Sequence, residues 1–130
     1  MIENMIIEVK QCLPLAVSEV KWDGTLFHMY GPKWSFTTLS SWRMSTTSKM
    51  LFGCFDEGSE KLISCLKNTA IVDINIQTNS LKIDPVFIFS NGQRMEIFST
   101  DTFEPWTFNV HELGFFSATP SVPECFDPEK

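Results

Sequence analysis

The sequence carries no catalytic signature. A serine hydrolase elbow requires Gly-x-Ser-x-Gly, a P-loop requires Gly-x-x-x-x-Gly-Lys followed by Ser or Thr, and a dinucleotide site requires a glycine-rich turn after a strand. None of these motifs occurs in the 130 residues. A nucleophilic pair of Cys54 or Cys65 with His28 would be purely spatial and would leave no local mark. We therefore expect a binding protein rather than an enzyme.

Residues that could hold a metal or a cofactor are also scarce. His28 and His111 are the only two histidines, and neither is spaced for metal binding with a cysteine or a carboxylate. The four cysteines are widely separated and form no Cys-x-x-Cys pair: Cys12, Cys54, Cys65 and Cys125. This spacing excludes a zinc ribbon and a thioredoxin-like motif, and it favours reduced thiols. We expect no metal and no cofactor.

Positive charge is in short supply. The 10 Lys and Arg residues stand against 16 Asp and Glu residues, which gives a net charge of −6 and a pI of about 4.8. Nucleic acid and anionic membranes would repel such a chain at long range, so the sequence argues against both as partners. A basic partner is favoured, although acidity also serves solubility alone.

Long apolar runs are missing as well. Nowhere do 18 apolar residues follow one another, and the N-terminus has no basic region of the kind that begins a signal peptide. A hydrophobic content of 43% with 20% charged residues is typical of a globular chain. We expect one cytoplasmic domain that spans residues 1–130.

Aromatic residues, in contrast, are abundant. The sequence has 12 Phe and 4 Trp, which is more than a core of this size needs, so some aromatic side chains are expected near the surface. Trp34 and Trp42 lie in aromatic-rich segments that suit strands. We expect these two residues to be partner contacts.

The most regular segment is 84–98, which predicts a β-hairpin. Asn91-Gly92 would form a two-residue type I′ turn, because both residues tolerate positive φ. Counting outward from this turn pairs Ile88 with Met95. One face would hold Val86, Ile88, Met95 and Ile97, and the other would hold Phe87, Phe89 and Phe98 beside Arg94 and Glu96. Because both faces are apolar, we expect a central hairpin, and we expect Ile88→Asp to unfold the domain.

Two helices follow from the spacing of apolar residues. Residues 1–13 repeat apolar side chains every three or four positions and predict a helix that ends before Pro14. A strand remains an alternative for residues 5–9, which are also rich in β-branched side chains. A second, short helix is expected at 59–67, with an apolar side and charged residues in solvent.

The rest of the chain alternates with a period of two. Residues 17–55 predict a first β-meander, with a hairpin turn at Asp23-Gly24, and residues 70–110 predict a second one. Residues 120–130 are rich in proline and are expected to be irregular. The predicted fold is α+β, a single domain with a mostly antiparallel sheet of about six to eight strands and one or two short helices packed on it. The two halves look weakly alike, which fits a duplicated β-meander and equally fits chance.

A resemblance rests on the second half. The segment from Leu81 to Phe98, followed by Glu104-Pro105-Trp106, runs as an apolar strand, an Asn-Gly turn, a second apolar strand, a polar loop and a Glu-x-Trp. This order resembles a bacterial family of small cytoplasmic proteins found among the immunity proteins of polymorphic-toxin and contact-dependent growth inhibition systems. The interrupted segment at Asp84-Pro85 departs from the smoother strand of that pattern.

The resemblance implies a binding function. A protein of this kind neutralises a cognate toxin domain by blocking its active site or its access to substrate, and the acidity of the chain favours a basic toxin, with a nuclease as one candidate. The alternative is a small-molecule or glycan-binding module lined by Trp and Phe. A large secreted-toxin reading frame directly upstream would favour the first function.

Two acidic turns supply the candidate contacts. Asp56 and Glu57 precede the second helix, and Asp101 and Glu104 lie between the hairpin and the last strand. Loops on a rigid sheet are common recognition sites, so we expect these four carboxylates to face the partner. Each of them has the alternative of being only a solvated turn residue.

Overall fold

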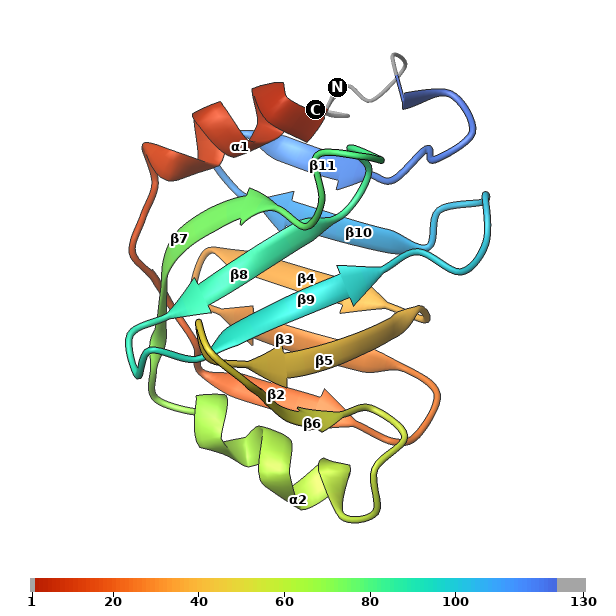
Figure 1. Ribbon diagram of the computed structural model, residues 1–130. Helices are drawn as coiled ribbons and strands as arrows, with labels where there is room; N and C mark the ends of the chain where they lie inside the picture. The colour runs from red at the N-terminus through yellow and green to blue at the C-terminus, as the bar shows by residue number, and fades with distance from the viewer. Residues whose placement is uncertain (1, 124–130) are drawn as a thin grey trace.

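The structure is a computed structural model that describes residues 2–123. Two antiparallel sheets lie face to face in it (Figure 1). The first sheet contains β1 (Leu15–Ala16), β5 (Ser41–Ser45), β6 (Met50–Gly53), β7 (Ala70–Ile76), β8 (Pro85–Phe89) and β9 (Arg94–Phe98). The second contains β2 (Glu19–Trp22), β3 (Phe27–Gly31), β4 (Trp34–Thr38), β10 (Trp106–Val110) and β11 (Gly114–Ser117). Their orders are β1-β7-β8-β9-β5-β6 and β11-β10-β4-β3-β2. The predicted α+β class with mostly antiparallel sheets in a single domain is confirmed.

The strands differ from the prediction in number and in grouping. The described residues form eleven strands in two sheets, whereas six to eight strands in one sheet were expected. The shortest edge strands escape a search for alternation, since β1 has two residues and β11 begins at a glycine with φ of 121°. The predicted meander at 17–55 is split, because the chain passes from β4 in one sheet to β5 in the other at residues 39–40.

The two halves of the chain repeat one topology. Apart from the two-residue β1, each half begins with a helix, continues with a three-stranded meander and crosses to the opposite sheet for two further strands. The pairing of β4 with β10 corresponds in this repeat to the pairing of β9 with β5. This pseudo-twofold order supports the duplication that the sequence left open.

The helices pack beside the strands near the sheet edges. Helix α1 (Ile2–Lys10) packs against β7 and buries the apolar stripe that the sequence predicts: Ile2, Met5, Ile6 and Val9. Helix α2 (Ser59–Leu62) and the 3-10 turn η1 (Ile63–Leu66) pack against β2. Figure 1 shows α1 and α2 at opposite ends of the stack of strands. Within residues 2–123, no helix is long and apolar enough to cross a membrane.

Aromatic side chains fill the space between the sheets. Phe36 of β4 meets Phe87 of β8 with ring centroids 4.8 Å apart, and Trp22 meets Trp42 at 5.3 Å, both in edge contacts that aromatic pairs prefer. All four tryptophans are buried, Trp34 and Trp42 at 2% exposure each. The expectation that Trp34 and Trp42 offer rings to a partner is therefore wrong, because both rings belong to the core that the inner faces of the two sheets form.

The hairpin of β8 and β9 is central, as predicted, but its turn is longer. The Gly92 N–H donates to the Phe89 carbonyl, and the Phe89 N–H donates to the Gln93 carbonyl, both at 2.9 Å. Residues 90–92 therefore form a three-residue loop. Gly92 has φ of 84° and Asn91 does not have positive φ, whereas a type I′ turn requires positive φ at both.

The extra loop residue changes which side chains face the core. Phe87 pairs with Met95, and Ile88 pairs with Arg94. Ile88 is half-buried on the outer face, so the predicted pairing of Ile88 with Met95 is wrong. The core face of the hairpin is formed by Phe87, Phe89, Met95 and Ile97.

The predicted irregular tail at 120–130 is described only in part. Residues 120–123 contain a turn and no strand or α-helix. Residues 124–130, which include Cys125, lie outside the described residues.

Candidate functional site

Four loops lie at one end of the sandwich, and we name them together the acidic loop end: residues 23–26, 39–40, 54–58 and 99–105. Strand pairing and hydrogen bonds join neighbours within this set. The Leu39 N–H donates to the Pro105 carbonyl at 3.3 Å, and the Thr100 N–H donates to Ser40 Oγ at 3.3 Å. Loop 23–26 continues into the pairing of β3 with β4, next to residues 39–40. In Figure 1 these connections lie at the right of the molecule.

The acidic loop end carries charge of one sign. Its sequence contains five carboxylates and no Lys or Arg, and all five are exposed: Asp23, Asp56, Glu57, Asp101 and Glu104. Four of these are the predicted contact residues, which the fold brings to the same end although they are far apart in sequence. Like charges held on neighbouring loops reinforce one another's field toward an approaching cation.

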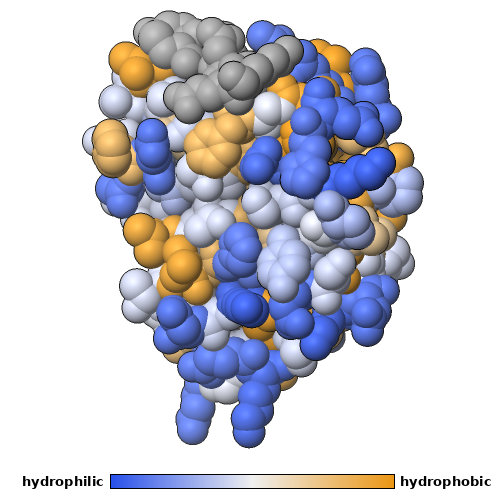
Figure 2. Space-filling model, turned by 180° about the vertical axis from the view of Figure 1, so that it is seen from behind, coloured by the Kyte–Doolittle hydropathy of each residue, from blue (hydrophilic) through white to orange (hydrophobic). Residues whose placement is uncertain are grey.

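Exposed apolar side chains stand among these carboxylates. Phe55 is 82% exposed and Phe103 is 81% exposed, while Leu39 reaches 62% and Leu26 reaches 39%. From behind, most of the visible surface is polar, and apolar side chains also gather at the margin that corresponds to this end (Figure 2). We did not predict Phe55 or Phe103 from the sequence, although a phenylalanine inside an acidic turn was a visible signal.

Two carboxylates of the acidic loop end also accept hydrogen bonds from backbone N–H groups. Asp23 accepts hydrogen bonds from the Leu26 and Thr25 N–H groups at 2.8 and 2.9 Å, and these bonds lower the pKa of Asp23. Asp56 accepts from the Gly53 N–H at 2.8 Å. It does not cap α2, whose N-cap is Gly58.

The other three carboxylates are not engaged. Glu57, Asp101 and Glu104 make no hydrogen bond or ion pair among residues 2–123. Their charges are thus available to a partner without breaking an existing contact.

A buried carboxylate fixes the largest of these loops. Asp84 is 5% exposed. It accepts hydrogen bonds from the Ser99 N–H at 2.7 Å, from the Ser99 hydroxyl and from the Trp106 indole at 3.1 Å. Because Ser99 begins the loop and Trp106 follows it, Asp84 holds both ends of the segment that presents Phe103. The sequence offered Asp84 only as a strand interruption.

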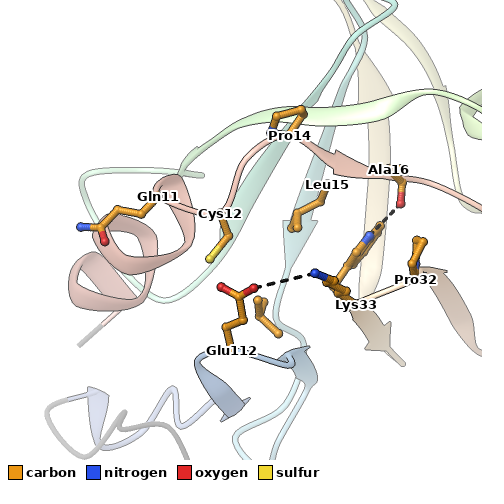
Figure 3. Close-up of a pocket in the computed structure, with 10 residues that line it drawn as sticks. Gln11, Cys12, Pro14, Leu15, Ala16, Pro32, Lys33 and Glu112 are labelled. Carbon is orange, nitrogen blue, oxygen red and sulfur yellow. Dashed lines mark hydrogen bonds and ion pairs between the residues drawn. The ribbon is translucent and has the colours of Figure 1, made fainter.

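A cavity of about 470 Å³ opens at the opposite end of the sandwich (Figure 3). It is lined by Gln11, Cys12, Pro14, Leu15, Ala16, Pro32, Lys33, Trp34, Val110 and Glu112. Among the described residues, Trp34 is the only tryptophan on its wall and no phenylalanine lines it, so this part of the wall does not match the Trp- and Phe-lined site of the alternative function.

The thiols and histidines do not form a catalytic arrangement within residues 2–123. His28 Nδ1 lies 2.7 Å from Thr37 Oγ1, and burial together with the charge of Lys21 lowers the pKa of His28. Cys65 is exposed overall, but partial desolvation of its thiol raises its pKa, and the thiol donates to Gln93 Oε1 at 3.2 Å, so it is not activated as a nucleophile. Among the described residues, no three His, Cys, Asp or Glu side chains are grouped so as to hold a metal ion.

Comparison with protein-family models, curated proteins and solved structures gave no match.

Proposed function

We propose that the protein is a cytoplasmic immunity protein, which neutralises a cognate toxin domain by binding it with the acidic loop end. The partner surface is basic, as the active-site groove of a nuclease would be. Binding there blocks the groove or the path of the substrate to it, and the protein itself needs no chemistry.

The observation that carries this proposal is the exposure of two phenylalanine rings among unpaired carboxylates. Phe55 and Phe103 are each more than 80% exposed at one end of a domain whose other aromatic side chains are largely packed in the core. Burying such a ring stabilises a complex by about 1.5–3 kcal/mol, and aromatic anchors of this kind dominate many interfaces. The two rings are suited to enter pockets of the partner.

The carboxylates are suited to a different part of the binding process. Glu57, Asp101 and Glu104 are exposed and unengaged, so solvent screens each single pair and limits it to about 1 kcal/mol or less. Their summed field acts at longer range and raises the rate of encounter with a basic surface. In this proposal affinity comes mainly from the rings and speed comes mainly from the charges.

The test uses a growth assay with the product of an adjacent toxin reading frame. Cells that express that product should grow only when this protein is present. The double variant Phe55→Ser and Phe103→Ser should lose protection, because both anchors are gone. Phe115→Ser, which removes a 36% exposed ring from β11 of the five-stranded sheet, is the matched control and should protect fully. Full protection by the double variant would refute the proposed binding surface.

A further inference from the structure

The cavity at the opposite end of the sandwich combines an apolar floor with polar groups at its mouth. Leu15, Trp34 and Val110 are buried at 6%, 2% and 2% exposure and form part of the wall. A volume of about 470 Å³ lies within the range of roughly 300–1,000 Å³ that small-molecule sites occupy. The wall can therefore bury the apolar body of a small ligand.

The wall itself is firmly held. The Trp34 indole N–H donates to the Ala16 carbonyl at 2.8 Å, which ties the segment after α1 to β4. Gly31 lies directly beside this bond, since a Cβ on Gly31 would lie 1.9 Å from the Ala16 oxygen and 2.4 Å from Trp34 Nε1. A pre-formed cavity of this kind keeps its shape without a ligand, so binding costs little ordering.

Two opposite charges stand at the mouth. Lys33 Nζ and Glu112 Oε1 are 4.0 Å apart, and their side chains are 72% and 69% exposed. Figure 3 shows these two side chains turned toward each other, with the Cys12 thiol directed to the same space. A pair this exposed is worth little, so either charge can exchange its partner for a ligand group at small cost.

We propose that this cavity binds a small zwitterion with an apolar body, such as a free amino acid. The ligand ammonium group lies at Glu112, its carboxylate lies at Lys33, and its side chain lies on Leu15 and Val110. Glu112 also stands near the C-terminal end of α1, where the helix dipole favours a cation. A ligand with only one charge would leave either Lys33 or Glu112 beside a group that it does not match.

The test is an NMR titration of isotope-labelled full-length protein with L-leucine and L-phenylalanine. We expect saturable shifts at the amides of Cys12, Lys33, Trp34 and Glu112, with Kd on the order of 1 mM. Isocaproate lacks the ammonium group of leucine and isoamylamine lacks its carboxylate. Each should bind about tenfold more weakly than leucine, because one charge-assisted contact is lost.

Matched variants separate the charges from the cavity. Lys33→Met and Glu112→Gln should each weaken leucine binding about tenfold, whereas Lys49→Met and Glu60→Gln, at exposed charges outside the cavity, should leave it unchanged. The proposal is overturned if neither amino acid shifts the cavity amides, or if leucine, isocaproate and isoamylamine bind equally well. Because this cavity and the acidic loop end lie at opposite ends of the domain, either outcome leaves the toxin-binding proposal to its own test.

Discussion

Asp84 gives the sharpest test of how the acidic loop end is built. The carboxylate is 5% exposed and accepts three hydrogen bonds, two from Ser99 and one from Trp106, which is 1% exposed. In Asp84→Ala these three hydrogen bonds are lost. An unsatisfied buried donor costs about 1–3 kcal/mol, and Ser99 is only half-buried, so water can satisfy part of its loss. We expect the free energy of unfolding to fall by about 3 kcal/mol, out of a total of roughly 5–15 kcal/mol.

Two milder variants grade this effect. Asp84→Asn keeps one oxygen, which can still accept from the Ser99 hydroxyl and the Trp106 indole at the position of Oδ1, but its amide would face the Ser99 N–H that now meets Oδ2. Ser99→Ala removes only the hydroxyl contact. The expected order of destabilisation is Asp84→Ala, then Asp84→Asn, then Ser99→Ala, with about 1 kcal/mol for the last.

Urea denaturation followed by circular dichroism measures all three variants. With a slope of about 1–3 kcal/mol per M, the midpoint of Asp84→Ala should fall by about 1–3 M. A midpoint within roughly 0.2 M of the parent, about the precision of the method, would show that Asp84 does not hold the loop. An unchanged midpoint for Ser99→Ala together with a large loss for Asp84→Ala would instead assign the stabilisation to the bonds from the Ser99 N–H and the Trp106 indole.

Three further predictions follow from packing and charge. Gly31→Ala should lower the free energy of unfolding by about 1–3 kcal/mol, because its Cβ would overlap the Ala16 carbonyl. A melting temperature of the variant equal to that of the parent would refute the close approach. Phe87→Asp should abolish the cooperative unfolding transition, whereas Ile88→Asp, on the half-buried outer face, should keep it. The opposite result would favour the register of a two-residue turn, in which Ile88 faces the core. The pKa of His28 is lowered in the folded protein, so the unfolded chain binds the proton first as the pH falls. The contribution of His28 to the free energy of unfolding should therefore be full above pH 6.5 and decline below it. Urea titrations at several pH values should show a smaller decline for His28→Gln.

Much of the secondary structure could be predicted because it depends on local spacing. The stripe of α1 and the alternation in β3, β4 and β10 are properties of consecutive residues. The division of the strands into two sheets does not follow from local spacing. It depends on the crossing at residues 39–40, where the chain changes sheet with only two residues between β4 and β5. The predicted hairpin register was wrong because Asn91-Gly92 is compatible with both a two-residue and a three-residue loop.

The residues of the candidate site could also be predicted only in part. Asp56 and Asp101 were identifiable because acidic residues in turns lie at the surface. Trp34 and Trp42 were misjudged because an aromatic residue in a strand can face either side, and only the second sheet decides which side is buried. Phe55 and Phe103 were missed because a phenylalanine is expected inside, and its exposure is a property of the folded loop.

Association kinetics can show whether the acidic loop end meets a basic partner. The association rate of the adjacent reading frame's product is measured against ionic strength for the parent and for one combined variant: Asp56→Asn, Glu57→Gln, Asp101→Asn and Glu104→Gln. Glu8→Gln, at an exposed carboxylate of α1, serves as control and should match the parent. We expect the combined variant to associate about tenfold more slowly at low salt, with a flatter dependence on salt, and its thermal transition to be unchanged. A rate and a salt slope equal to those of the parent would contradict this expectation.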